Sequence, residues 1–220
     1  MINWLFKIGL LLPNLGLLTS IFKLIAARIR SIIQLINLKK SQDISPIIIF
    51  ALPKSGSTWL EKMLADIPEY SEYMPWQAAL SELIHGASTD YKLKRNHILP
   101  VLNSKAVIKV HSSFDKETQK WLINENIKYL VLTRDIEEEF ESHYHYVTKT
   151  SFHPDYKRLC KMTKIEAMEW IKRRYSNDFA RWVDNWSANI SRFGVLIDYQ
   201  ELINDTKGVF NKILRHLEIE

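Results

Sequence analysis

The stretch that decides the fold is IIIFALPKSGSTWL, residues 47–60. It opens with an apolar run rich in isoleucine, as in a buried strand, and continues through a polar loop into residues that suit a helix. Backbone N–H groups at a helix start have no partner within the helix, and the helix dipole adds positive potential there. Lys54 adds a full charge, and Ser55, Ser57 and Thr58 add hydroxyl donors. The stretch therefore predicts an anion site.

Two general explanations of this loop remain open at this point. The nucleotide-binding pattern G-x-x-x-x-G-K-[ST] does not match, because Ala51 stands at the place of the first glycine and Lys54 precedes Gly56. An ordinary turn at a helix start would also explain a Lys-Ser-Gly-Ser segment. The loop alone does not decide between a phosphate site and such a turn.

The rest of the chain predicts an α/β fold of three layers, α/β/α, around a central parallel sheet. Apolar β-rich runs alternate with helical patterns, which is the order of strands joined by crossover helices. The chain of 220 residues suits one catalytic domain, assigned to 43–220, after a basic apolar segment, 1–42. The predicted strands are 47–52, 106–110, 128–133 and 194–198, and the predicted helices are 57–67, 116–126, 136–148, 164–192 and 206–217.

Chemistry-bearing residues follow two further predicted strands. His111 follows the strand 106–110, which contains Lys109, and Arg134 follows the strand 128–133. Ligands of open α/β sheets bind beyond the carboxyl ends of the strands, so these side chains should share a crevice with Lys54. Histidine suits a proton acceptor, and arginine suits bidentate binding of a phosphate. Taken singly, a strand-end histidine is more often structural and such an arginine more often makes a surface ion pair.

Four segments together resemble the sulfotransferases that use 3′-phosphoadenosine 5′-phosphosulfate (PAPS) as sulfuryl donor. PKSGSTWL at 53–60 closely resembles their 5′-phosphosulfate loop, and KVH at 109–111 resembles the strand end that carries their catalytic histidine. Arg134 with Ser142, eight residues later, is similar to their 3′-phosphate element. GVLIDYQEL at 194–202 resembles, more loosely, the strand whose tyrosine, here Tyr199, lies near adenine. The resemblance runs from about residue 47 to 217 and implies a P-loop-NTPase-like sulfotransferase fold.

The resemblance also implies roles for individual residues. Lys54, Ser55, Gly56, Ser57 and Thr58 would hold the 5′-phosphosulfate, while Arg134 and Ser142 would hold the 3′-phosphate. Trp59 and Tyr199 would lie against the adenine. His111 would be the base, with Lys54 and Lys109 neutralising charge that grows during transfer.

The implied reaction is in-line transfer of the sulfuryl group from PAPS to a hydroxyl, with an amine as the second option. No metal ion is expected. The acceptor is expected to be a small molecule or a lipid. Cytosolic-type members continue past the tyrosine strand to a basic loop over the 3′-phosphate, whereas this chain stops at Glu220, so we expect either another device there or impaired donor binding.

Two other classes of function stay open. A membrane-tethered, non-catalytic protein with a decayed nucleotide site would also carry a basic apolar leader and a short C-terminus. A P-loop kinase or NTPase would need Mg²⁺, but the lysine is misplaced and Arg134 occupies the position where a carboxylate is expected.

The net charge of +5 belongs to the N-terminal segment. Residues 1–42 hold six basic residues and no acidic one, which leaves −1 for the remainder, so no nucleic-acid partner is expected. Apolar residues recur at helical spacing over 21–38, which predicts either a helix on an anionic membrane surface, through residues 1–40, or a helix packed on protein. The uncharged run 8–22 has only 15 residues, too few to span a bilayer. With one cysteine, Cys160, we expect a cytoplasmic protein, peripheral on the membrane if the first option holds. The oligomeric state is not predicted.

Three further patterns are interpreted by their simplest explanations. The segment 68–104 is rich in aromatic residues and suits an acceptor pocket, although packing alone would explain most of its rings. The acidic run 137–141 is expected to be a solvated helix face. The aromatic stripe at 170–186 is expected to be core.

Overall fold

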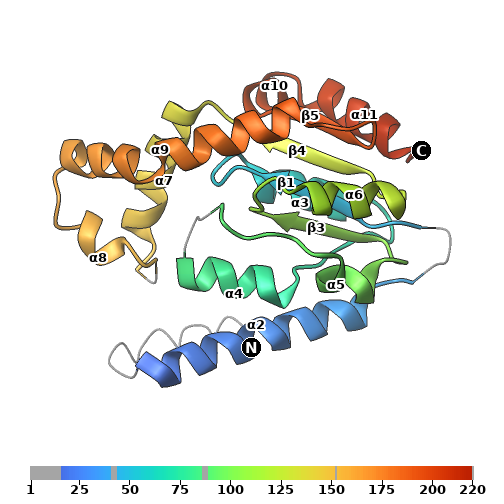
Figure 1. Ribbon diagram of the computed structural model, residues 1–220, viewed down its shortest axis with the longest axis horizontal. Helices are drawn as coiled ribbons and strands as arrows, with labels where there is room; N and C mark the ends of the chain where they lie inside the picture. The colour runs from blue at the N-terminus through green and yellow to red at the C-terminus, as the bar shows by residue number, and fades with distance from the viewer. Residues whose placement is uncertain (1–15, 41–43, 86–88, 152, 220) are drawn as a thin grey trace.

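The computed structural model describes residues 16–40, 44–85, 89–151 and 153–219. Its centre is a five-stranded, all-parallel sheet in the order β2-β3-β1-β4-β5 (Figure 1). The four predicted strands are confirmed, and a short edge strand is added to them. The strands are β1 (Ile47–Ala51), β2 (Ser71–Glu72), β3 (Ala106–Val110), β4 (Tyr129–Thr133) and β5 (Gly194–Asp198).

Helices cover both faces of this sheet. The five predicted helices are confirmed, although α3, α6 and α9 end two to four residues earlier than expected. After α6, Asn126 adopts a left-handed conformation with φ 55°, which stops the helix. The helices are α2 (Gly16–Asn37), α3 (Ser57–Ala65), α4 (Trp76–His85), α5 (Arg95–Ile98), α6 (Lys116–Asn124), α7 (Ile136–Lys149), α8 (Tyr156–Leu159), α9 (Lys164–Ala188), α10 (Tyr199–Asn204) and α11 (Thr206–Leu217), with the 3-10 helix η1 (Leu99–Val101).

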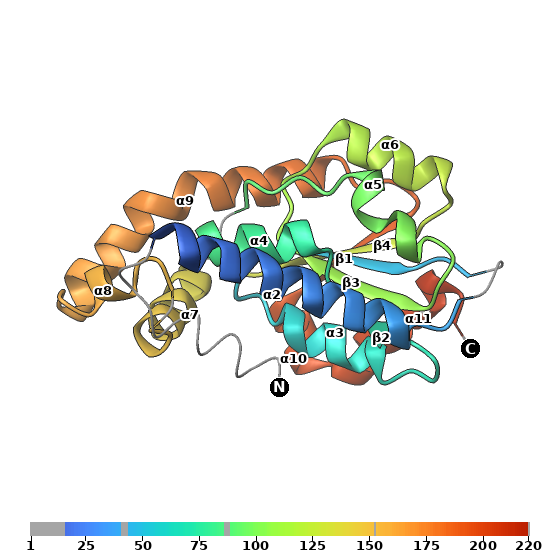
Figure 2. The same cartoon turned by 90° about the horizontal axis from the view of Figure 1, so that it is seen from below.

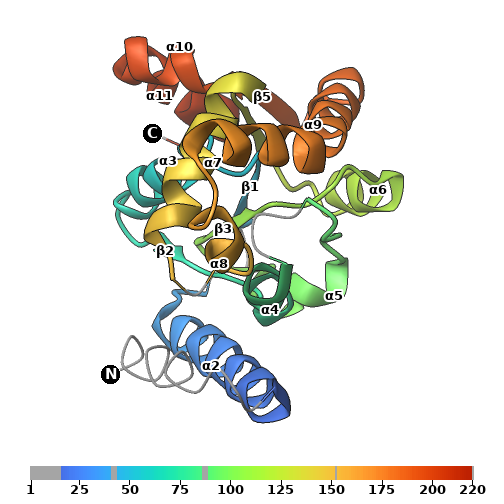
Figure 3. The ribbon, with the colours of Figure 1, turned by 90° about the vertical axis from the view of Figure 1, so that its left-hand side faces the viewer.

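The strands separate two hydrophobic cores because successive side chains point to opposite faces. Ile48 and Phe50 of β1 join the core formed with α4, α6 and α9, whereas Ile47 and Ile49 join the core formed with α3, α10 and α11. The end-on view in Figure 3 shows α3 on one side of the sheet and α6 on the other. This arrangement is the predicted three-layer α/β/α fold.

The helices α7 and α8 and the start of α9 lie beyond the carboxyl ends of the strands (Figures 1 and 2). The strand arrows of β3 and β4 point toward this group in Figure 1. It therefore covers the edge of the sheet where ligands bind in folds of this kind.

The long helix α9 fixes the position of the end of β3. The indole N–H groups of Trp182 and Trp186 both donate to the carbonyl oxygen of Ser112, at 2.7 and 3.1 Å. The Trp186 ring also stacks on Phe50, with the ring centroids 4.3 Å apart. The aromatic stripe is thus core as predicted, and it holds the residue next to His111.

The helix α2 packs one face on the domain and leaves an apolar stripe outside. Ala26, Ala27 and Ser31 are buried on the packed face, where the Ser31 hydroxyl lies 3.2 Å from the Tyr73 hydroxyl. Lys23 donates to the Leu83 carbonyl at 3.2 Å. The exposed stripe consists of Ile21, Phe22, Ile25, Ile32, Ile33 and Ile36. None of the described helices is long and apolar enough to cross a membrane.

We predict that Trp186→Phe destabilises the domain by about 1–3 kcal/mol, because it removes a buried hydrogen bond and part of a stacked ring. Chemical denaturation followed by circular dichroism measures this loss. Trp170→Phe, at a partly buried position on the same helix, is the control. An equal loss in both variants would contradict a specific role for the bond to Ser112.

Candidate active site

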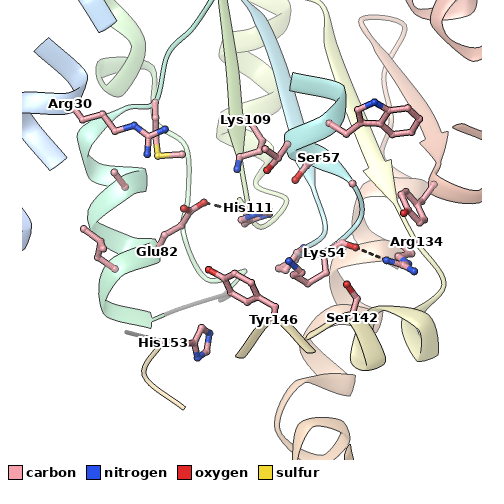
Figure 4. Close-up of a pocket in the computed structure, with 18 residues that line it drawn as sticks. Arg30, Lys54, Ser57, Glu82, Lys109, His111, Arg134, Ser142, Tyr146 and His153 are labelled. Carbon is pink, nitrogen blue, oxygen red and sulfur yellow. Dashed lines mark hydrogen bonds and ion pairs between the residues drawn. The ribbon is translucent and has the colours of Figure 1, made fainter. Parts of the chain in front are cut away.

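A cavity of about 500 Å³ opens at the carboxyl ends of β1, β3 and β4 (Figure 4). Its walls come from the loop after β1, the end of β3, and the helices α2, α3, α4 and α7. The lining residues are Arg30, Pro53, Lys54, Gly56, Ser57, Thr58, Trp59, Met74, Ala79, Glu82, Leu83, Lys109, His111, Arg134, Ser142, Tyr146, His153 and Tyr199.

The loop between β1 and α3 has a tightly constrained backbone. The Ser55 hydroxyl donates to the Leu52 carbonyl at 2.6 Å, so Ser55 stabilises the loop by a bond within it. Ser55 does not line the cavity. Lys54 and Gly56 both have positive φ, 58° and 80°. A Cβ at Gly56 would lie 2.5 Å from the Tyr199 ring, so only glycine fits there.

The start of α3 is open toward the cavity. Gly56 is its N-cap, and no side chain forms a capping hydrogen bond there. The first amides of a helix have no partner inside the helix, and the dipole makes this end positive. Ser57 and Thr58 therefore stand in an environment that favours an anion, as the sequence predicted.

Lys54 extends from this loop into the cavity. Its ammonium lies 4.0 Å from the centroid of the Tyr146 ring. Burial is the main cause that lowers the pKa of Lys54, Glu139 opposes this effect, and Lys109 and Arg134 lower the pKa further. Lys54, Lys109 and Arg134 thus lie close enough for their charges to repel, and an anionic ligand would offset this repulsion.

Arg134 lies on the other side of the loop. Its guanidinium donates to the Lys54 carbonyl at 2.9 Å and stands over the Tyr199 ring, 4.3 Å from its centroid. It also pairs with Glu138 at 3.2 Å, and the carboxylate of Glu138 accepts two bonds from Gln200. Ser142 lies beside Lys54 and Arg134 in Figure 4.

His111 lies at the centre of the cavity, between the Lys54 loop and α4 (Figure 4). Its Nδ1 lies 2.8 Å from the Ala51 carbonyl oxygen, which can only accept, so Nδ1 carries the proton. The lone pair is then on Nε2, which lies 3.7 Å from Glu82 Oε1. Burial is the main cause that lowers the pKa of His111 below its usual value. The imidazole is therefore neutral near pH 7 and can accept a proton at Nε2.

Lys109 enters the cavity from β3 beside a buried carboxyl group. Its ammonium lies 3.9 Å from Glu61 Oε2, and both side chains are at most 10% exposed. Burial is the main cause that raises the pKa of Glu61 from 4.5 to about 7, and Lys109 partly opposes it. The charge of Lys109 is thus only partly balanced near neutral pH.

The expectation of a solvated acidic face at 137–141 is wrong for Glu139. This side chain is fully buried, with its carboxylate 3.2 Å from Nδ1 of His143, because α7 packs on α9 and turns this face inward. Burial raises the pKa of Glu139. The neighbouring His153 lines the cavity, and burial lowers its pKa to about 4. Where Glu139 is ionised, its charge raises the pKa of Lys54.

The structure brings ten of the eleven residues predicted for the site to one cavity, and Ser55 is the exception. Sequence reasoning missed Glu82, Glu61, Tyr146 and Arg30. Tyr146 lies one helical turn after Ser142, so the i, i+4 spacing could have indicated it. Glu82 and Arg30 come from helices whose position against the sheet no local pattern predicts.

Within the part of the chain that the structure describes, no group of three or more His, Cys, Asp and Glu side chains is placed to hold a metal ion. The charged groups of the cavity instead suit a phosphate-bearing ligand. Lys54, Lys109 and Arg134 converge there with the uncapped end of α3. The fold and the cavity thus define an α/β protein whose loop after β1 suits a phosphate.

The family model described as the sulfotransferase domain matches residues 45–220, and the chain belongs to this family. No curated protein matches the amino-acid sequence of this chain. The structure is similar to the crystal structure of mouse sulfotransferase SULT7A1 complexed with PAP, with a TM-score of 0.56 and 17% identity. That match covers 87% of this chain, and this chain spans only 65% of the length of the mouse protein.

Two further solved structures are similar at lower scores. A sulfotransferase from Alicyclobacillus acidocaldarius is 13% identical, with a TM-score of 0.48 and coverage of 80% of this chain and 82% of the other. A sulfotransferase domain from the curacin biosynthetic pathway is 15% identical, with a TM-score of 0.45 and coverage of 82% and 76%. At these identities the likeness concerns the fold.

The buried pair of Glu61 and Lys109 predicts a pH dependence of stability. A raised pKa means that the folded state binds the proton of Glu61 more tightly than the unfolded state does. The free energy of unfolding therefore falls as the pH rises from about 4.5 to about 7, by no more than about 3 kcal/mol, and this contribution is constant outside that window.

Urea denaturation of the wild type and Glu61→Gln, at a series of pH values from 4.5 to 8, measures this effect. We expect a smaller fall of stability in the variant, because glutamine does not titrate. The exposed Glu117→Gln on α6 is the control and should keep the wild-type slope. Parallel curves for all three proteins would show that Glu61 has an ordinary pKa.

Proposed function

We propose that this protein transfers the sulfuryl group of PAPS to the O–H or N–H group of an acceptor. The observation that carries the proposal is the meeting of Lys54, Arg134 and His111 in one cavity at the open end of α3. Family membership supports the reaction type. The mouse relative of similar fold was solved with PAP, the desulfated form of such a donor.

The chain offers separate contacts for the two ends of the donor. The amides of Gly56, Ser57 and Thr58 suit the 5′-phosphosulfate, since no side chain caps this helix. Arg134 and Ser142 suit the 3′-phosphate, as the family resemblance implies. Arg134 is held by Glu138 and by the Lys54 carbonyl, so its guanidinium is oriented before a ligand arrives. Trp59 and Tyr199 border the same space and suit the adenine.

His111 has the geometry of a general base. Its Nδ1–H is fixed on the Ala51 carbonyl, so Nε2 faces the cavity with a free lone pair. Its lowered pKa keeps it neutral at pH 7, and we expect turnover to be lost only well below pH 6.5. Lys54 and Lys109 line the same space and would neutralise charge that grows as the donor bond breaks.

The structure supports the two other function classes, a kinase or NTPase and a decayed nucleotide site, less well. A kinase or NTPase needs Mg²⁺ ligands, and Arg134 follows β4 where such a site has a carboxylate. A decayed nucleotide site would not require His111 to keep a tautomer that leaves Nε2 free. Binding and turnover measurements separate these classes.

We expect the protein to bind 3′-phosphoadenosine 5′-phosphate with micromolar affinity and without Mg²⁺. Arg134→Ala should weaken this binding about 10- to 100-fold, because it removes charge-assisted bonds to a phosphate. His111→Ala should leave binding unchanged and lower turnover with PAPS about 100-fold or more. Calorimetry and release of the desulfated nucleotide are the two measurements. Tighter binding of ATP with Mg²⁺ would favour an NTPase, and weak binding of both nucleotides would favour a decayed site.

We also propose that the exposed stripe of α2 binds an anionic membrane surface. The six apolar residues of the stripe are 39% to 76% exposed, while the opposite face of α2 packs on the domain. Residues 1–42 contain basic side chains and no acidic one, which complements an anionic surface. Arg30 of the same helix lines the cavity, so the bound membrane would lie near the acceptor.

The double variant Ile25→Glu/Ile32→Glu tests this without deleting α2, which packs on the domain. We expect it to lose vesicle binding by about tenfold or more in cosedimentation with phosphatidylglycerol vesicles. Ile165→Glu is the matched control, because Ile165 is 74% exposed on α9. Equal binding by all three proteins would refute the proposal. Concentration-dependent dimers that the double variant abolishes would instead assign the stripe to a second copy.

A further inference from the structure

Two hydrogen-bond acceptors face each other at the acceptor end of the cavity. Nε2 of His111 and Oε1 of Glu82 lie 3.7 Å apart, and the dashed line between them in Figure 4 crosses this end of the cavity. Since the His111 proton is on Nδ1, where it is held by the Ala51 carbonyl, no hydrogen lies between Nε2 and the carboxylate. The distance also exceeds that of a hydrogen bond. A group that donates one hydrogen bond to each of the two atoms would therefore satisfy both acceptors.

The number of hydrogens on the acceptor atom decides what can satisfy this pair. A hydroxyl has one hydrogen and can donate to His111 or to Glu82, but not to both. A primary ammonium has three hydrogens and can donate to both at once. Its positive charge also suits the carboxylate of Glu82.

The number of protons that the reaction releases also favours an ammonium over a hydroxyl as the acceptor group. Sulfation of an alcohol releases one proton, whereas sulfation of an ammonium to a sulfamate releases two. The cavity has two groups that can accept them, His111 and Glu82, and these lie 3.7 Å apart, so one ammonium nitrogen beside the pair can reach both.

Apolar side chains border this end of the cavity. Met74, Ala79 and Leu83 line it beside Glu82, and Ala79 and Leu83 come from the same helix, α4. Arg30 of α2 and Tyr146 of α7 are the polar neighbours. An acceptor with a short apolar chain behind its amino group fits these walls.

We propose that Glu82 is a second proton acceptor and that it selects a primary amine on an apolar carrier as the acceptor of the sulfuryl group. This inference rests on the proposed sulfotransferase function. It places Glu82 in contact with the nucleophile, on the side opposite the donor loop.

An ammonium acceptor, R–NH₃⁺, gives up two protons during the transfer. Nε2 of His111 takes one proton and frees the nitrogen lone pair. The nitrogen–sulfur bond forms while the bond from sulfur to the 5′-phosphate oxygen breaks, and its electron pair leaves with that oxygen. Glu82 takes the second proton, which leaves the sulfamate R–NH–SO₃⁻.

A different role of Glu82 makes a different prediction. A carboxylate near Nε2 also stabilises a protonated imidazole, whatever atom gave the proton. In that case Glu82→Gln would lower the rates of alcohol sulfation and amine sulfation equally. A matched pair of acceptors distinguishes the two roles.

Octylamine and 1-octanol form such a pair, because they differ only in the acceptor group. The full chain, Glu82→Gln and the exposed control Glu169→Gln are assayed with PAPS, and release of the desulfated nucleotide and the mass of the product are measured. We expect a kcat/KM for octylamine at least about tenfold above that for octanol. In Glu82→Gln this preference should disappear, through a loss of about tenfold or more on the amine and little change on the alcohol. The control should behave as the wild type.

Three results would overturn the inference. The first is a wild-type preference for octanol, and the second is an equal loss on both acceptors in Glu82→Gln. The third is the absence of sulfamate product from any primary amine in a panel of aliphatic and aromatic amines. Calorimetry with 3′-phosphoadenosine 5′-phosphate runs beside each assay. If the wild type does not bind this nucleotide, the result counts against the sulfotransferase function itself. If it binds the nucleotide but gives one of the three results above, only the inference about Glu82 is overturned.

Discussion

The parallel pairing of β1 with both β3 and β4 is the constraint on which the site depends. Ala51 of β1 pairs with Leu132, and Phe50 pairs with Val110, so the three strands end at one level. The loop after β1, His111 after β3 and Arg134 after β4 therefore reach the same cavity. The pairing continues one residue past β1, where the Leu52 amide donates to the Leu132 carbonyl at 3.0 Å. A register slip of one residue would turn these side chains to the wrong faces.

The charge balance of the cavity suits a polyanion. Lys54, Lys109 and Arg134 are partly buried, and gathering like charges away from water is costly unless partners compensate. Glu138 pairs with Arg134, Glu61 lies near Lys109, and Glu139 stands behind Lys54. Burial, and after it the charges of Lys109 and Arg134, still lower the pKa of Lys54 despite the opposing effect of Glu139. A ligand with several phosphate charges would offset the repulsion among these cations, so under the proposed function the same cations would serve binding and catalysis.

The two ends of the cavity differ in chemistry. The end formed by the loop after β1 and by α7 offers backbone amides, hydroxyls and cations. The end formed by α2 and α4 offers the Glu82 carboxylate, Arg30 and apolar side chains, with His111 between the two ends (Figure 4). In the proposed reaction, donor and acceptor would enter different ends and meet at the imidazole. The apolar stripe on the outer face of α2 lies next to this second end, so a membrane bound there would be close to the acceptor.

The sequence by itself determined the sheet, most of the helices and the grouping of the β1 loop with His111 and Arg134. Buried parallel strands appear as short apolar runs, and the residues that follow them must share one edge, so Lys54, His111 and Arg134 could be grouped without coordinates. The tertiary structure decided what no local pattern contains. Glu139 is buried because α7 packs on α9. Ser55 does not line the cavity, and its hydroxyl donates to the Leu52 carbonyl. The tertiary structure also carried Glu82 to within 3.7 Å of His111, because the position of α4 depends on packing between segments distant in the chain.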